Sequence, residues 1–302
     1  MSANPVFLRA RRGARLQVAC SRIRLAMRLK LPVRTASRWA AAAAAAALLA
    51  SVSACGDAEG RAETASAAAP VEQLPPAIIQ PLAYPYAPGS SALSGRMTGI
   101  VRLAVVPPED TIVRPASQQD VCGTQFRDET VRVVQADRLA GALVWVSNPP
   151  AGKPMPTSRR FEITAARCRL TPRVVATVAG GTLNVKSSDR VLHRIRVLNS
   201  RSGDTHAVLL HNDRGQVIPV HEPLETAGLL ELRGDVHQWM RAWVAVFDHP
   251  YFTVTGRDGS FELDSLPPGR YELRTWHERF GVRVDSVEVG EGETVVEVSI
   301  TE

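Results

Sequence analysis

The chain has 302 residues, enough for one large domain or two small ones, with 36 basic residues, 30 acidic residues and a formal net charge of +6. Residues 1–54 hold ten of the Lys and Arg residues and no Asp or Glu. The remainder has 26 basic and 30 acidic residues, a net charge of −4, so nothing in it indicates binding to nucleic acid.

Residues 1–54 have the pattern of a secretory signal peptide. A basic stretch precedes an apolar run at 39–50 that contains eight consecutive alanines, and small residues follow. The run is too short and too rich in Ala for a good membrane-spanning helix. The basic stretch is long, and a start at Met27 instead of Met1 would leave a signal of conventional length; both starts remain open.

The sequence VSAC at 52–55 follows directly and resembles a bacterial lipobox. The resemblance implies cleavage before Cys55 and diacylation of its sulfur, and two acyl chains anchor a protein stably to a membrane. Gly56 follows instead of Asp, which in lipoprotein-sorting terms implies the periplasmic face of the outer membrane in the cell envelope. The alternative is ordinary cleavage near Ala54 with an incidental cysteine.

Residues 55–94 are rich in Ala, Pro, Ser and Glu and have no apolar period, so they predict a flexible tether between lipid and folded domain. The folded part is expected to begin near Gly95. Export removes Cys20 and lipidation uses Cys55, which leaves Cys122 and Cys168. An even pair in an oxidising compartment predicts a disulfide, with a role as metal thiolates as the alternative.

From residue 95 onward the patterns indicate strands. TGIVRLAVV (98–106) alternates, AGALVWVS (140–147) is almost continuously apolar, and further short strands are separated by clusters of Gly, Pro, Asp and Asn. No segment has a convincing helical period. The chain is therefore predicted to be all-β, with sandwiches in place of alternating strands and helices.

Residues 168–247 resemble a cupredoxin. The pieces that carry the resemblance are CRLTPRVVATVAGGTLNVKSSDRVLHRIRV and LRGDVHQWM. His193 matches the first histidine ligand of that family, His237 the second and Met240 the methionine, whereas Gly234 occupies the position of the cysteine. The resemblance implies a degenerate copper site, because the thiolate is the decisive ligand of a blue-copper centre.

Residues 243–302 resemble a carboxypeptidase-regulatory-like domain, which has a transthyretin-like, carbohydrate-binding-like fold. The sequence that carries this resemblance is TVTGRDGSFELDSLPPGRYELRTWHE at 253–278, with turns expected at its DG and LPPG sequences. Within 95–167, the sequences TGIVRL and LAGALVWV also resemble the opening strands of that family. One open interpretation is that the cupredoxin-like unit is inserted into this sandwich. The combination resembles exported bacterial proteins of a methylamine-utilisation-like group.

Two interpretations of the His/His/Met set remain. Two imidazoles and a thioether are able to hold copper more weakly than a blue-copper centre does, or the loop is vestigial with hydrogen-bonded histidines and no cofactor. The vestigial interpretation is favoured. His249 and His277 are weaker candidates that are expected to meet at one end of the sandwich, with structural roles as the favoured interpretation.

Catalysis has little support, since the sequence lacks a nucleophile elbow, a phosphate-binding loop and a helical HExxH motif. The favoured function is a lipid-anchored cell-envelope protein that binds and is not an enzyme, with an envelope protein or a glycan as partner. The first alternative is a copper-binding or electron-transfer protein that uses His193, His237 and Met240. The second is a carbohydrate-binding module, which rests on fold analogy alone.

Overall fold

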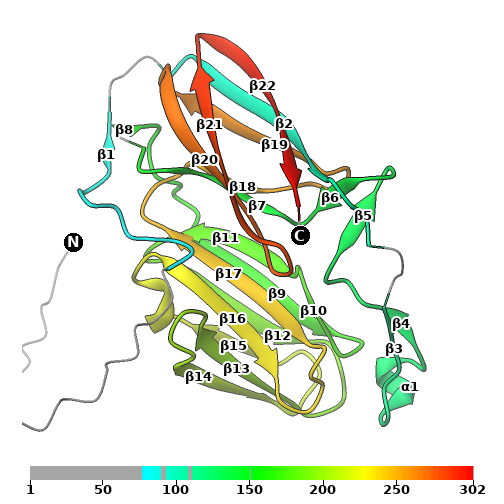
Figure 1. Cartoon of the computed structure of the whole chain (residues 1–302). Coiled ribbons are helices and arrows are strands. Elements are labelled where there is room, and N and C mark those ends of the chain that lie inside the picture. The colour runs from blue at the N-terminus through cyan, green and yellow to red at the C-terminus, as the bar shows by residue number, and fades with distance from the viewer. Residues whose placement is uncertain (1–76, 90–92, 108–110, 150, 302) are drawn as a thin grey trace, which may run out of the picture. The chain divides into compact units, whose positions relative to one another are not determined.

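The computed structural model describes residues 77–89, 93–107, 111–149 and 151–301. The predicted signal peptide and Cys55 lie outside the described residues. The prediction of an all-β fold is confirmed (Figure 1). Within the described part, the helices are the single turns α1 (Gln119–Cys122) and η1 (Glu222–Leu224), and neither is long enough to cross a membrane.

One sandwich, called here the inserted sandwich, is formed by consecutive strands in the middle of the chain. Its first sheet has the order β10-β9-β12-β15 and its second has the order β11-β17-β16-β13-β14. The strands are β9 (Arg160–Ala166), β10 (Arg169–Thr171), β11 (Val174–Val178), β12 (Thr182–Ser187), β13 (His193–Asn199), β14 (Thr205–His211), β15 (Val217–Val220), β16 (Gly228–Gly234) and β17 (Arg241–Phe247).

The other sandwich, called here the flanking sandwich, takes strands from both sides of the insertion. Its sheets have the orders β18-β7-β20-β21 and β19-β2-β6-β5, and β22 joins the second by pairing in parallel with β2. The strands are β2 (Gly95–Leu103), β5 (Arg132–Val134), β6 (Arg138–Ala140), β7 (Leu143–Ser147), β18 (Phe252–Val254), β19 (Ser260–Leu266), β20 (Gly269–His277), β21 (Gly281–Val289) and β22 (Gly292–Ile300).

Two short strand pairs complete the described structure. β1 (Ala87–Pro88) pairs in parallel with β8 (Ala151–Gly152), and β3 (Ile112–Val113) pairs in antiparallel with β4 (Phe126–Arg127). The segment that holds β3, α1 and β4 brings Gln118 and Cys122 to the inserted sandwich, where Cys122 is part of the buried core.

Continuous apolar runs occur where a strand is covered on both faces. In β17, Val244 and Val246 belong to the core of the inserted sandwich, while Ala245 and Phe247 belong to a third cluster shared with β7 and β20. β7 likewise divides its alternate residues between the core of the flanking sandwich and this third cluster. Because successive strand residues face opposite sides, burial of both faces requires an unbroken apolar sequence.

The structure differs from two expected boundaries. β9 lies within the first expected β segment, at 95–167, but it pairs with β12 over six residues and so belongs to the inserted sandwich. Residues 77–89 were expected to form part of the tether, yet Ile79 is 2% exposed in the third cluster, and the Leu82 amide donates to Asp248. Because Ile79 packs in this cluster, the packed region begins upstream of Gly95.

Candidate functional site

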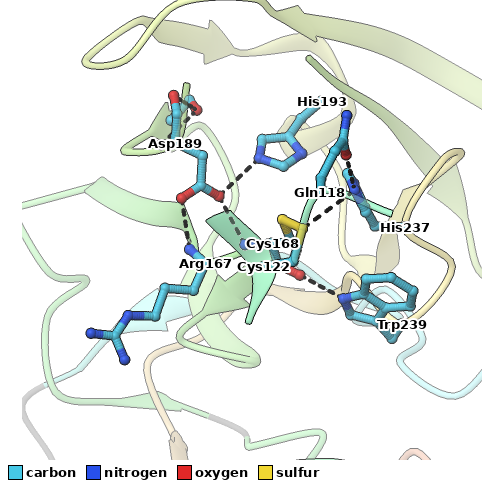
Figure 2. A network of polar contacts seen from close by, with 9 residues as sticks. Gln118, Cys122, Arg167, Cys168, Asp189, His193, His237 and Trp239 are labelled. Atoms are coloured by element: carbon cyan, nitrogen blue, oxygen red, sulfur yellow. Dashed lines mark hydrogen bonds and ion pairs between the residues drawn. A yellow bond between two sulfur atoms is a disulfide. The ribbon is translucent and has the colours of Figure 1, made fainter. Parts of the chain in front are cut away.

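The candidate site gathers side chains from four separate parts of the chain at one end of the inserted sandwich. His193 begins β13, Asp189 lies in the loop before it, and His237 lies in the loop between β16 and β17. Cys168 lies in the turn between β9 and β10, and Cys122 ends α1. Figure 2 shows these side chains pointing toward one another, and all five are at least 94% buried.

Asp189 holds two parts of the site together. One carboxylate oxygen accepts the Arg167 amide at 2.7 Å, and the other accepts the Cys168 amide at 2.8 Å and lies 2.9 Å from Nε2 of His193 (Figure 2). Arg167 and Cys168 have φ of 50° and 56°, the left-handed pair that a two-residue hairpin turn requires. The carboxylate therefore stabilises a costly turn and orients a histidine at the same time.

His193 has a free lone pair at its second nitrogen. A carboxylate only accepts hydrogen bonds, so Nε2 carries the hydrogen, and in the neutral ring Nδ1 is then unprotonated. Nδ1 is buried and has no hydrogen-bond partner. A histidine held by a carboxylate through one nitrogen, with the other nitrogen free, is the usual arrangement of a metal-ligating imidazole.

His237 lies beside His193 and the disulfide. The two imidazole centroids are 5.2 Å apart, and Nε2 of His237 lies 2.7 Å from Oε1 of Gln118 and 3.6 Å from Sγ of Cys122 (Figure 2). Trp239 packs against the His237 ring at 5.3 Å and donates its indole N–H to the carbonyl of Cys168. The loop after β16 is thus tied to the turn that carries Cys168.

The predicted disulfide between Cys122 and Cys168 is confirmed. Both cysteines are part of the core of the inserted sandwich, with exposures of 3% and 0%. Two groups of potential ligand atoms meet at this bond. Cys122, Cys168 and His237 form one, Cys168, Asp189 and His193 form the other, and the atoms of each group lie within 4.8 Å of one another.

Gly234 and Met240 show that the residues present do not suit a blue-copper centre. A Cβ added to Gly234 would lie 2.8 Å from the carbonyl oxygen of His237 and 2.9 Å from Cβ of Met240. The loop closes on itself there, since the Met240 amide donates to His237 and the Gly234 amide to Met240. The space that a thiolate at this position would need is therefore filled, and Met240 is packed in the core at 1% exposure.

The site favours neutral imidazoles. Burial lowers the pKa of His237, the nearby His193 lowers it further, and Asp189 opposes this effect. Burial also lowers the pKa of His211, which pairs with His193 across β13 and β14 and whose Nε2 lies 2.8 Å from the Val185 carbonyl. Neutral imidazole is the form that binds metal ions.

The structure does not bring His249 and His277 together. His249 lies near Ser147 at the end of β7, whereas His277 ends β20 and lines a different cavity beside Gly141, which precedes β7. Nδ1 of His249 accepts the Tyr251 amide, and Nδ1 of His277 accepts the Arg279 amide. Burial lowers the pKa of each to about 4. These contacts agree with structural roles.

The carboxylates of Glu278 and Asp235 form ion pairs that the sequence pattern does not indicate. Glu278, 4% exposed on its side chain, binds the guanidinium of Arg173 with both oxygens and accepts the indole N–H of Trp243. Asp235 binds Arg196 and Arg194, two arginines of β13. Both carboxylates are therefore engaged in ion pairs with arginines.

Sequence reasoning missed Asp189 and Gln118 as parts of the site. Asp189 precedes His193 by four residues within the sequence SSD, where the cupredoxin resemblance expects an Asn-containing turn, so that departure was the available signal. Gln118 is separated from His237 by 119 residues. No local pattern marks it.

No protein-family model matches the chain, and no curated protein matches it. Among solved structures the chain is similar to a purple cupredoxin from Nitrosopumilus maritimus, with 17% identity and a TM-score of 0.24 over 28% of this chain and 97% of that one. It is also similar to amicyanin from Paracoccus versutus, with 16% identity and a TM-score of 0.26 over 30% of this chain and 83% of that one. Similarity at these TM-scores carries no information on function.

Proposed function

We propose that the chain is a lipid-anchored protein of the cell envelope that binds and does not catalyse, and that its inserted sandwich binds copper through His193 and His237. The observation that carries the metal proposal is the buried Nδ1 of His193, which has no hydrogen-bond partner and lies on a ring that Asp189 orients. An unpaired buried polar atom costs free energy unless a ligand satisfies it.

The expected site differs from that of a blue-copper protein. With the disulfide intact, the ligands on offer are two imidazoles, which suit copper but give no intense thiolate-to-copper absorption. His193 is held by Asp189 and His237 by Gln118, so both rings are oriented before any ion arrives. Both rings are almost fully buried, which keeps bulk water from competing for the ion.

Copper retention tests this proposal. Exported Cys55→Ala chain, purified without reductant, is dialysed against Cu²⁺ and then against buffer, and copper per chain is measured. We expect stoichiometric copper, no intense visible band, and loss of copper in His193→Gln and His237→Gln. His206→Gln is the matched control, because His206 is exposed on β14. Equal retention by all three variants, or none by the parent chain, would refute the site.

Anchoring by Cys55 is supported by the VSAC sequence and the tether composition. Palmitate labelling in cells tests it. Cys55→Ala should abolish labelling and release the exported protein from the membrane fraction, whereas Cys20→Ala, in the part that export removes, should leave labelling unchanged. Label in Cys55→Ala equal to that in the parent would contradict the anchor and the outer-membrane location that depends on it.

A carbohydrate-binding role has a weaker basis. Sugar platforms use exposed aromatic rings, and among the described residues the large exposed side chains include one aromatic, Tyr84, at 42% exposure. Arg173, His277 and Glu278 help to line a cavity of about 280 Å³ that a polar ligand could occupy. Copper binding therefore remains the first candidate.

A further inference from the structure

We propose that the Cys122–Cys168 disulfide is a redox gate over a four-ligand metal site, which forms when the bond is reduced and then holds a thiophilic ion, Cu(I) or Zn²⁺, between Cys122, Cys168, His193 and His237. This inference shares its two histidines with the proposed function. It differs in the oxidation state of the two cysteines and in the ligand set, so the two are tested separately.

The geometry of the sulfur atoms carries the proposal. The Sγ atoms of Cys122 and Cys168 and a ring nitrogen of His237 lie within 4.8 Å of one another, and Sγ of Cys168 lies within the same distance of a ring nitrogen of His193. Metal–sulfur and metal–nitrogen bonds in tetrahedral sites are about 2.3 Å and 2.0–2.1 Å long. Ligand atoms around one such ion are separated by less than 4.8 Å, so each group of three already has suitable spacing, and the two groups share Sγ of Cys168.

The chemistry of the four groups is that of a known class of site. Two thiolates with two imidazoles form the Cys₂His₂ set that holds Zn²⁺ tetrahedrally, and thiolates also favour Cu(I). The ligand loop has lost its own thiolate position at Gly234, where the backbone of His237 fills the space. Sulfur instead reaches the histidines from α1 and from the β9–β10 turn.

Three of the groups are already positioned. Asp189 binds the Cys168 amide and His193 with the same oxygen, so it holds together a ligand from the β9–β10 turn and a ligand from β13. The Trp239 indole binds the carbonyl of Cys168 and packs on His237, which places the third ligand. A metal site works only when its surroundings hold its ligands in this way.

Reduction of the disulfide frees the two sulfur ligands. A dithiol donates two electrons and two protons to the Cys122–Cys168 bond, which breaks to give two thiols while the donor becomes a disulfide. The ion then binds the two sulfurs as thiolates and two protons pass to solvent. A disulfide oxidant reverses the sequence. It accepts the two electrons from the thiolates and two protons from solvent to become a dithiol, the Cys122–Cys168 bond forms again, and the ion loses two of its four ligands.

Cobalt binding to the reduced chain tests the gate. The exported Cys55→Ala chain is reduced under argon with a water-soluble phosphine, which becomes a phosphine oxide, and is titrated with Co²⁺. We expect one Co²⁺ per chain with a thiolate-to-cobalt band and the absorption of a tetrahedral ion, displaced by Zn²⁺. The oxidised chain should show neither band. Cys122→Ser and Cys168→Ser should each weaken the thiolate band and lower affinity.

The histidine variants separate a built site from free thiols. His193→Gln and His237→Gln should lose the tetrahedral spectrum after reduction, and His206→Gln should keep it. A reduced parent chain that binds no Co²⁺, that loses its β-sheet circular dichroism, or that binds as tightly as both histidine variants would overturn the gate. Copper retention by the oxidised chain is measured independently, so a failure of either proposal is visible by itself.

Discussion

Sγ of Cys122 lies 3.6 Å from Nε2 of His237, although the two residues are 115 positions apart in the chain. The contact places the disulfide against the loop that resembles the ligand loop of a cupredoxin. The disulfide and the two candidate histidine ligands therefore share one buried volume. Changes to either cysteine should affect stability and the histidine environment together.

Removal of the disulfide should weaken the fold substantially. Cys122 and Cys168 are separated by 46 residues, and closing a loop of that length stabilises a protein by about 3–4 kcal/mol in the chain-entropy model. The double variant Cys122→Ala/Cys168→Ala should lose that much free energy of unfolding, measured by urea denaturation against the oxidised parent. A loss below about 1 kcal/mol would contradict a structural contribution from this bond.

The cysteine pair and the strand content could be predicted from local information. Parity and an exported chain predicted the disulfide, and the apolar run at 140–147 predicted the strand β7. The site needed more, because Asp189 meets Cys168 only through the turn between β9 and β10, and Gln118 meets His237 only where a single helical turn packs on the sandwich. Such contacts depend on tertiary packing that no local period contains.

The position of His249 and His277 shows the same limit. Each was expected from its neighbours in sequence to face a common end of the sandwich. Pairing of β7 with both β18 and β20 instead separates them, since His249 follows Phe247 near Ser147 and His277 lies near the other end of β7. Strand register decides this placement, and register is a property of paired strands.

Asp189 should contribute to stability mainly by accepting three hydrogen bonds. In Asp189→Asn one oxygen becomes an NH₂ group that is unable to accept, so the Cys168 amide or His193 loses its partner. We expect a loss of about 2–4 kcal/mol in free energy of unfolding at neutral pH, by urea denaturation. Asp204→Asn on an exposed turn is the control, and an equal effect in both variants would contradict the assigned role.

The Asp189 carboxylate also predicts that the free energy of unfolding falls in acid. Burial alone raises the pKa of Asp189, but the hydrogen bonds from His193 and from the Cys168 and Arg167 amides outweigh burial and hold the pKa below its usual value. A lowered pKa in the folded state gives stability that is present above the unfolded pKa and is lost as pH falls through the folded pKa. In Asp189→Asn, the free energy of unfolding should therefore depend less on pH below about pH 4 than it does in the parent, as measured by urea denaturation at several pH values.

His249 and His277 should make the protein sensitive to milder acid. Burial lowers the pKa of each from 6.5 to about 4, so the unfolded chain takes up their protons first as pH falls. Their stabilising effect is complete above pH 6.5 and declines between that pH and about 4, by about 3 kcal/mol for each residue.

His249→Asn checks this, because Asn keeps an acceptor for the Tyr251 amide and does not titrate. Urea denaturation at about pH 7 and about pH 4.5 should give a smaller difference in unfolding free energy for the variant than for the parent. His206→Asn should behave like the parent. An unchanged difference in His249→Asn would mean that the folded protein admits a proton at His249.

Gly234 provides the last prediction, since it decides whether a thiolate can be returned to the ligand loop. A Cβ there would meet the His237 carbonyl at 2.8 Å, and backbone does not yield as a flexible side chain does. Gly234→Ala should therefore lose about 1–3 kcal/mol in free energy of unfolding. Gly228→Ala, in the same strand with nothing within 4 Å of the added Cβ, should change little.

Gly234→Cys should be destabilised in the same way and, when loaded with copper, should give no intense thiolate-to-copper band in the visible spectrum. A blue copper complex of Gly234→Cys with unchanged stability would show that the loop from His237 to Met240 opens freely.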